Sequence, residues 1–237
     1  KEQRQLLRKA AADGMVLLKN NSLLPLDPTI KNLAVIGPNA KEAQIIGGGS
    51  ASLKPHYQSQ PLEAIKNRLS EQTNITYAKG CHTHKYLPKI EESLMGNKQG
   101  FLVEYFEGST FDENLLVSEY LVGNKFWVFE GFAKDVIAKL ERPDISVRFS
   151  CDYIPNITGD HEFEIFGIGK ARLLINGNEI IDNWTETSPG EAFFSFSSES
   201  RKGKVNLKKD ETFKIEIEYK FEGNFPAIYI GCQAPDK

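Results

Sequence analysis

The hydrophobic period changes along this sequence, and that change constrains the fold more than any other feature. In the second half, Ile145–Cys151 and Phe213–Phe221 place an apolar residue at every second position, with polar residues between them. Such alternation is typical of antiparallel strands with one face in a core and one in water. Between two apolar runs, Asn176-Gly177-Asn178 predicts a tight hairpin, because glycine tolerates a positive φ. The second half is therefore predicted to be an antiparallel β-sandwich or barrel.

The first part of the chain shows helical periods and short apolar runs instead. Two apolar stripes at spacings of three and four predict a helix over Lys1–Asn20 that buries a wide face. The unbroken run Leu33–Ile36 predicts a strand buried on both faces, and Asn74–Cys81 predicts a second strand. Pro61 marks the first turn of another helix. This order of elements predicts part of a layered α/β sandwich with parallel strands.

The change of period divides the chain. It falls near residue 96, so we expect two domains, residues 1–96 and residues 97–237. Two strands and two helices are too few for a doubly wound sheet, because they leave sheet edges and apolar faces uncovered. We therefore expect the α/β part to dock on chain outside this sequence, or its sheet to continue after Lys237. A β-domain inserted into a surface loop explains both features, because insertions are tolerated best at such loops.

Composition excludes several classes of function. The net charge is −3 and the basic residues are scattered, so we expect neither nucleic acid nor a membrane as partner. No apolar run approaches the ~20 residues that span a bilayer. The three cysteines are too dispersed for a disulfide framework, so reduced thiols are expected. The chain does not begin with methionine, so we expect the natural N-terminus upstream. A cytoplasmic and a secreted location both stay open, and no cofactor is expected.

Several segments carry a family resemblance. AAADGMVLLKNNSLLPLD, AVIGPNA, GGGSASL, PLEAI and YAKGC follow one another in the first part. Together they resemble the start of the second domain of family 3 glycoside hydrolases, which implies a flavodoxin-like α/β fold. GFLVEYFEG, SVRFSCDYIPNITGDHEFEI and ARLLINGNEIIDNW come later. They resemble the protective-antigen domain, a β-sandwich that a subset of β-glucosidases in this family carries as an insertion in the second domain.

The resemblance implies retaining hydrolysis of a terminal β-linked sugar, most often glucose, in a β-glucoside or a short oligosaccharide. This chemistry needs two carboxyl groups about 5–5.5 Å apart across the glycosidic bond. In the family, one lies on a barrel domain and the other late in the second domain, and neither segment is present here. We therefore assign no catalytic residue, and do not promote Asp152, Asp160, Glu91 or Glu92. The barrel and the rest of the α/β domain are the expected partners.

A glycine-rich loop is the first candidate for substrate binding. Gly49 and Ser50 lie in the run Gly47–Ser50, which lacks the lysine of a phosphate-binding loop. The run is either a tight turn after a strand or, as in the family, part of the wall of the interdomain active-site cleft.

Aromatic residues of the second part are the other candidates. They crowd stretches of poor periodicity, at Phe126, Trp127, Phe129, Phe132, Phe193, Phe194 and Phe196. Flat rings pack against the apolar C–H faces of sugars. We select Phe126, Trp127, Phe193 and Phe194 as rings bordering the aglycone subsite. Packing in the core stays open for each of them, and Phe193 and Phe196 are alternatively core residues of one strand. For Trp184, in the resembling hairpin, a structural role is favoured.

Neither candidate metal site fits a metal. The run Cys81–His84 offers fewer than the four ligands of a tetrahedral structural site, so an exposed loop is favoured. Lectin-type protective-antigen domains hold calcium through adjacent aspartates. At that place Gly167–Lys170 has no carboxylate, and the lysine repels a cation. No metal site is predicted.

The second domain has three candidate roles. We favour a wall on the active site that restricts the aglycone side and selects short substrates such as cellobiose. An independent carbohydrate-binding module and an element that holds a homo-oligomer together are the two alternatives.

Overall fold

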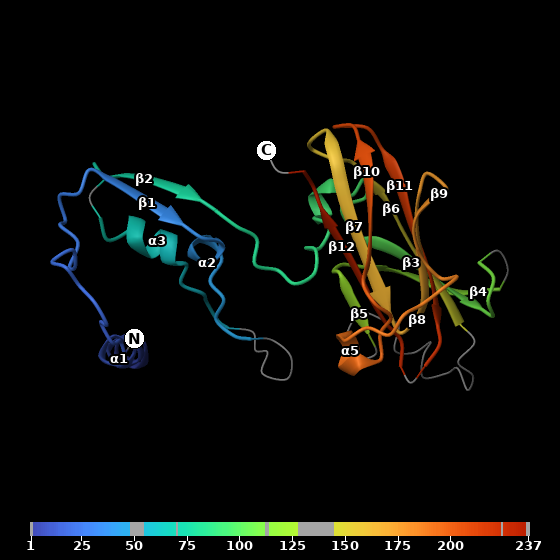
Figure 1. The fold of residues 1–237 in the computed structure, drawn as a ribbon, viewed down its shortest axis with the longest axis horizontal. Coiled ribbons are helices and arrows are strands. Elements are labelled where there is room, and N and C mark those ends of the chain that lie inside the picture. Colours follow the sequence, from blue (N-terminus) through green and yellow to red (C-terminus); the bar gives the residue numbers. More distant parts are fainter. Residues whose placement is uncertain are drawn as a thin grey trace. The chain divides into compact units, whose positions relative to one another are not determined.

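The chain forms two units that differ in architecture. The computed structural model describes residues 2–47, 55–69, 71–111, 114–127, 145–223 and 225–235. One unit comprises Lys1–Thr83 and the other His84–Lys237. The first contains helices and parallel strands, and the second consists mostly of antiparallel strands (Figure 1).

The first unit is a small α/β structure. Its elements are α1 (Glu2–Asp13), β1 (Asn32–Ile36), α2 (Pro38–Lys41), α3 (Pro61–Lys66) and β2 (Asn74–Ala78). β1 and β2 pair in parallel, with Asn32 opposite Asn74 and Ile36 opposite Ala78. Pro61 occupies the first turn of α3, where its missing N–H costs nothing. The predicted order of helix, strand, helix and strand and the parallel pairing are confirmed.

Two predictions for the first unit are wrong. The helix expected over Lys1–Asn20 ends at Asp13, just before a glycine, and none of its residues is buried. β1 is not buried on both faces, because exposed and half-buried positions alternate along it and Ile36 is 70% exposed. Within the described residues this sheet has two strands, so much of its apolar surface lies uncovered in the unit. None of the described helices has the length and apolar character that crossing a membrane requires.

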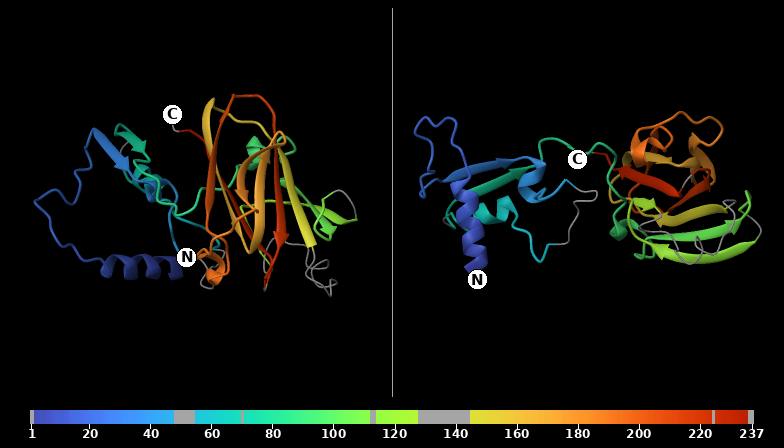
Figure 2. Two further views of the ribbon diagram at one scale, coloured as in Figure 1. Left: turned by 45° about the vertical axis from the view of Figure 1, so that its right-hand side comes forward. Right: turned by 90° about the horizontal axis from the view of Figure 1, so that it is seen from below.

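The second unit is built from two antiparallel sheets. Its strands are β3 (Phe101–Glu107), β4 (Leu115–Leu121), β5 (Lys125–Trp127), β6 (Ile145–Tyr153), β7 (Gly159–Gly167), β8 (Gly169–Ile175), β9 (Asn178–Asn183), β10 (Arg201–Leu207), β11 (Phe213–Phe221) and β12 (Ala227–Gln233). In the part of the chain that the structure describes, one sheet has the order β10-β7-β12-β5 and the other β4-β3-β6-β11-β8-β9. Figure 2 shows both from two further sides. Among its described residues the unit also has two short helices, η2 (Glu92–Leu94) and α5 (Ala192–Ser195).

The alternating segments of the sequence are neighbours in the larger sheet. β6 and β11 pair with Ile215 opposite Cys151 and Ile217 opposite Phe149. β8 and β9 form the predicted hairpin, in which Asn176 and Gly177 have φ values of 49° and 78°. Two positive φ values in succession match the right-handed twist of the flanking strands. The antiparallel strands and this turn are confirmed.

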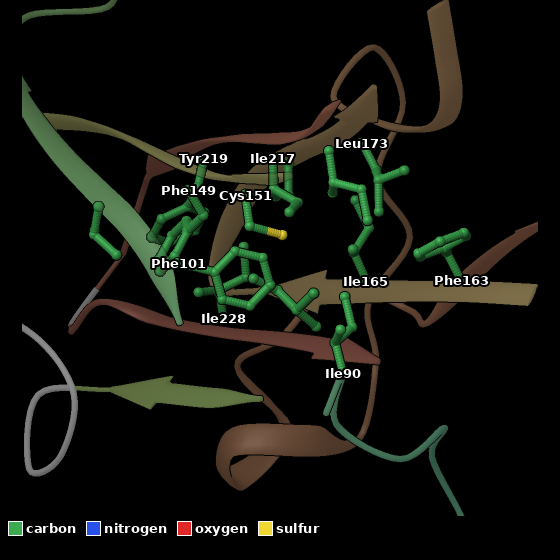
Figure 3. Close-up of a cluster of buried hydrophobic side chains, with 14 of the residues drawn as sticks. Ile90, Phe101, Phe149, Cys151, Phe163, Ile165, Leu173, Ile217, Tyr219 and Ile228 are labelled. Atoms are coloured by element: carbon green, nitrogen blue, oxygen red, sulfur yellow. The ribbon is translucent and has the colours of Figure 1, made fainter. Parts of the chain in front are cut away.

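One hydrophobic core joins the two sheets. Figure 3 shows Phe149 and Leu173 of the larger sheet and Ile165 and Ile228 of the smaller one in this cluster. Phe149 is fully buried, and its ring meets that of Phe101 edge-on at a centroid distance of 6.2 Å. Burying one such side chain stabilises the fold by about 1.5–3 kcal/mol. The inward residues of both sheets therefore hold them together.

The segment before β3 belongs to this core as well. Ile90 and Met95 are buried in it. The Cys232 backbone N–H donates to the carbonyl of Pro88 at 2.8 Å, and that of Ile154 donates to the carbonyl of Leu94 at 2.8 Å. The units therefore divide at residues 83 and 84, earlier than the boundary expected near residue 96. The segment between these two positions packs on the core without forming a strand of its own.

The burial of two of the three cysteines should make the free energy of unfolding depend on pH. Cys81 is exposed, whereas burial raises the pKa of the Cys151 and Cys232 thiols from 9.0 to about 12. Their folded-state pKa lies above the unfolded value, so unfolding releases protons once the pH exceeds about 9. We expect the free energy of unfolding, from urea titrations, to fall between pH 9 and pH 11.

A thiol reagent tests the same difference, because the thiolate is the reactive form. At pH 8 the native chain should react rapidly at Cys81. Cys151 and Cys232 should react with the reagent only after denaturation. A Cys81→Ser variant is the control, since it should show no rapid reaction. A second rapid thiol in the native chain would contradict the burial.

Candidate functional site

Aromatic rings gather where β5 ends and around the loop that contains α5. The ring of Trp127 lies 6.4 Å from that of Phe193 and 6.4 Å from that of Phe194. Phe225 contacts Phe194 at 6.4 Å and Phe196 at 6.0 Å, both edge-on. Phe194 is 72% exposed and Phe196 52% exposed, while Trp127 and Phe225 are half-buried. We call Trp127, Phe194, Phe196 and Phe225 the aromatic surface.

The loop behind this surface is closed at its base. The Gly190 N–H donates to the carbonyl of Ser197 at 2.7 Å, and the Glu199 N–H donates to the carbonyl of Ser188 at 2.6 Å. The Ser198 N–H donates to the carbonyl of Gly167 at the end of β7, at 2.8 Å. A Cβ atom on Gly190 would lie 2.2 Å from the Ser198 carbonyl oxygen, so only glycine fits there. The base therefore fixes residues 191–196 on the smaller sheet.

The loop carries three successive residues in the left-handed region. Phe193, Phe194 and Ser195 have φ values of 49°, 62° and 66°. For residues other than glycine this conformation costs roughly 1–2 kcal/mol each. Phe193 supplies an anchor, since it is 8% exposed and packs in a small cluster with Phe166, Ile168 and Ala227. This turn directs Phe193 inward and Phe194 outward, and such strain gathers at functional sites.

The predicted site residues have different surroundings. Phe126 is 1% exposed and packs against Phe101 and Phe149 in the main core, which is the alternative left open for it. Phe193 is an anchor beneath the aromatic surface, and Trp127 and Phe194 belong to that surface. Phe193 and Phe196 do not share a strand, because α5 and its turn replace the expected strand. Gly49 and Ser50 lie outside the described residues, and so do Phe129 and Phe132.

Sequence reasoning missed several residues of this region. Phe225 joins the aromatic surface, and the Lys125 ammonium lies 4.3 Å from the centre of the Trp127 ring. Tyr86 packs against Phe166 at 4.5 Å from a distant part of the sequence. The signal for Lys125 was its position two residues before Trp127 on one strand, because alternate residues share a face. No local pattern indicated Tyr86 or Phe225.

Two buried acids are held by hydrogen bonds and ion pairs. The carboxylate of Glu164 accepts from the Leu87 N–H and the Ser200 hydroxyl, each at 2.5 Å. Glu218 accepts from Arg172 at 2.7 Å and from Arg148 at 3.3 Å. These bonds use the carboxylates as structural acceptors.

The remaining expectations concern Trp184, Lys170 and metals. Trp184 is half-buried, packs on Phe111 at 6.0 Å and lies under the Arg172 guanidinium at 5.4 Å, which gives it a structural role. The Lys170 ammonium lies 3.9 Å from the carboxylate of Glu222. Residues 81–84 are exposed, as an open loop requires. Among the described residues, no three His, Cys, Asp or Glu side chains are grouped to hold a metal ion.

Comparison with known proteins shows the family to which the chain belongs. Residues 15–199 match the glycosyl hydrolase family 3 C-terminal domain. The chain therefore belongs to glycoside hydrolase family 3, as the sequence resemblance predicted.

Particular relatives are β-glucosidases. The chain is 32% identical over 99% of its length to a β-glucosidase from Rhizobium radiobacter, and spans 28% of that protein. It is 36% identical over 92% of its length to the probable β-glucosidase K of Emericella nidulans, and spans 26% of that protein. A crystal structure of a β-glucosidase from Kluyveromyces marxianus in complex with glucose matches the whole chain, with a TM-score of 0.75 and 27% identity. The match covers 30% of that structure's chain.

Because the turn is strained, two substitutions at Phe194 should differ in their effect on stability. Asparagine tolerates the left-handed region and alanine does not, and both remove a ring that is largely exposed. We expect Phe194→Asn to be more stable than Phe194→Ala by about 1 kcal/mol. Thermal unfolding should show a Tm higher by about 2–4 °C.

The matched control is the same pair of substitutions at Phe196, whose φ is −95°. There asparagine should give no advantage over alanine. Equal stabilities of the two Phe194 variants would contradict the strain at this position.

Proposed function

We propose that this chain is part of a β-glucosidase that hydrolyses terminal, non-reducing β-D-glucosyl residues with retention. The support is its 32% identity, over 99% of the chain, to a protein of that name, and its likeness to a β-glucosidase solved with glucose. The chain spans about a quarter of such relatives, so the activity belongs to the complete enzyme. The substrate class is a β-glucoside or a short oligosaccharide.

In this proposal the two catalytic carboxylates are supplied by other parts of the enzyme. Retention needs a nucleophile and an acid/base about 5–5.5 Å apart and both free to reach the sugar. The buried acids Glu164 and Glu218 are poor candidates, because hydrogen bonds and arginines already occupy their oxygens. The family's barrel and the rest of its second domain are the expected sources.

The proposed domain organisation is an insertion. In this proposal residues 1–96 belong to the first part of a flavodoxin-like α/β sandwich domain and residues 97–237 to a β-sandwich of the protective-antigen type. Residues 84–96 lead from one to the other and pack against the β-sandwich. Three observations support this: the parallel pair of β1 and β2, the core shared by two antiparallel sheets, and a family match that runs through both units. Gly49 and Ser50 are retained as candidates for the wall of the interdomain cleft.

Exposed apolar side chains indicate where the first unit meets its partners. In the described part of α1 and the segment after it, the following are between 63% and 92% exposed: Leu6, Leu7, Met15, Val16, Leu17 and Leu18. Leaving such a run in water forfeits about 1.5–3 kcal/mol per large side chain. The proposed occupant of this face is the enzyme's own barrel and the remainder of the α/β domain.

The second unit is proposed to shape the aglycone side of the active site. The observation that carries this is Phe194, a ring held 72% exposed by a turn that is costly for phenylalanine. Next to Trp127 it presents a flat apolar surface, and sugar C–H faces and aryl groups pack on such surfaces. A rigid loop at that place favours short substrates such as cellobiose, because a longer chain has to pass it.

Removing the Phe194 ring tests this in the complete enzyme. Phe194→Ala should lower kcat/KM for an aryl β-glucoside by about tenfold to a hundredfold, the value of burying one aromatic side chain against the substrate. Inhibition by glucose, which occupies the glycone side, should stay unchanged. Tyr120→Ala on β4 is the control, because Tyr120 is also an exposed aromatic residue, at 50%. A loss with Tyr120→Ala equal to that with Phe194→Ala would contradict the proposal.

Deleting residues 84–234 from the complete enzyme separates the three roles of the second unit, because it removes the segment with Ile90 and Met95 together with the core in which they pack. A wall predicts a changed preference between cellobiose and longer oligosaccharides. A binding module predicts weaker adsorption to glucan with that preference intact, and an oligomer contact predicts a smaller assembly in sedimentation. Unaltered chain-length preference would rule out the wall.

A further inference from the structure

The second unit begins with a segment that packs against β7 and β12 of the smaller sheet. We call residues 85–88 the strap. Ile165 of β7 faces the core, so its neighbour Glu164 lies on the opposite face of the sheet, where the strap packs. A Cβ atom on Gly231 of β12 would lie 2.6 Å from the Leu87 carbonyl oxygen. A side chain at that position would therefore displace the strap.

Hydrogen bonds fix the strap to the sheet at successive residues. The Leu87 N–H donates to the carboxylate of Glu164 at 2.5 Å, and the Leu87 carbonyl accepts from the Tyr229 hydroxyl at 2.8 Å. The carbonyl of Pro88 accepts from the Cys232 N–H at 2.8 Å. Because Cys232 belongs to β12, the first segment of the unit and its last described strand are held next to each other.

The same strap also holds the α5 loop, through three contacts. The Lys85 ammonium lies 3.1 Å from the carboxylate of Glu191, which directly precedes α5. The Tyr86 ring packs on Phe166 at 4.5 Å, and Phe166 packs on the Phe193 anchor at 5.9 Å. The third contact runs through a buried carboxylate. The position of the loop therefore depends on the strap as well as on the loop's own base.

The buried carboxylate belongs to Glu164, which is 1% exposed. One of its oxygens accepts from the Leu87 N–H of the strap, and the other accepts from the hydroxyl of Ser200, which follows the loop base. Hydrogen bonds to a carboxylate are stronger than those between neutral groups, and burial excludes the water that would compete for them. The ion pair of Lys85 and Glu191 is exposed and contributes little. Glu164 is therefore the strongest polar link between the strap and the loop.

We propose that Glu164 is a positioning residue for the aglycone side of the active site. It holds the α5 loop on the strap, and through the loop it keeps the Phe194 ring in place for the substrate. This inference rests on the aglycone role proposed above for Phe194. The strap follows directly on the junction of the two units at residues 83 and 84. A loop tied to it keeps its distance from that junction, whereas a loose loop lets the ring move away from the substrate.

Kinetics of the complete enzyme with an aryl β-glucoside test the proposal. Glu164→Met removes both acceptors, so KM should rise about threefold to tenfold at unchanged kcat, because the ring is in place for only part of the time. Glu164→Gln should keep KM within about twofold, since its amide accepts from the Leu87 N–H and donates to the Ser200 hydroxyl. In the Phe194→Ala enzyme, Glu164→Met should have no further effect on KM, because its effect runs through that ring.

Two further variants complete the set. Glu162→Met is the matched control, because Glu162 lies on the same face of β7 and pairs with Lys204 at 3.6 Å instead of with the strap or the loop. Its KM should equal that of the unmodified enzyme. Ser200→Ala breaks only the loop side of the link and keeps the Glu164 carboxylate. It should raise KM about twofold to fivefold, less than Glu164→Met, because the bond to the strap remains.

Hydrogen exchange measures the same link without any substrate. The Leu87 N–H is bonded to Glu164, and the Glu199 N–H is bonded within the loop base. Both amides should exchange about tenfold faster in Glu164→Met than in the unmodified enzyme, because the strap and the loop base open more often. Glu162→Met should leave both exchange rates unaltered.

The outcomes separate this inference from the proposed function. Unchanged exchange in Glu164→Met would overturn the positioning role, and so would an unchanged KM where Phe194→Ala raises KM. An equal rise in KM for Glu164→Met with and without the Phe194 ring would also overturn it, because the carboxylate would then act on the fold as a whole. A Phe194→Ala enzyme with unaltered KM would refute the aglycone role, and this inference with it.

Discussion

The hydroxyl group of Tyr219 ties the end of the second unit together. Tyr219 lies on β11 in the larger sheet and is fully buried. Its hydroxyl donates to the carbonyl of Ile168 at 2.7 Å and accepts from the N–H of Ala227 at 3.0 Å, where the smaller sheet's β7 ends and β12 begins. Burial raises the pKa of this hydroxyl, so it remains a protonated donor. Because Ile168 and Ala227 form the small cluster into which Phe193 packs, the position of the α5 loop depends on this bond.

Much of the second unit could be predicted because its signals are local. The alternation in β6 and β11 reports one buried and one solvated face, and the Asn176-Gly177 pair supplies the φ values that its hairpin needs. The first unit was harder. The apolar stripe of α1 indicates a buried face, yet burial requires a neighbouring surface, and in the described part of this unit no residue of α1 is buried. An apolar pattern therefore predicts which face of a segment can be buried, but it does not identify the surface against which that face packs.

The candidate site was predicted only in part, for a related reason. The sequence singled out Phe193 and Phe194 but not which one faces water, since that depends on three successive left-handed residues. Phe126 and Trp127 are adjacent in β5, so a strand necessarily sends them to opposite faces, one to the core and one toward the loop. Tyr86 reaches the same region from a segment without regular structure. Long-range packing, which no local pattern encodes, assembles these groups.

The loop base explains how the aromatic surface keeps its conformation. Gly190, Ser197 and Ser198 close the loop through backbone hydrogen bonds. The strain of the left-handed turn persists because this base and the Phe193 anchor over-determine the loop.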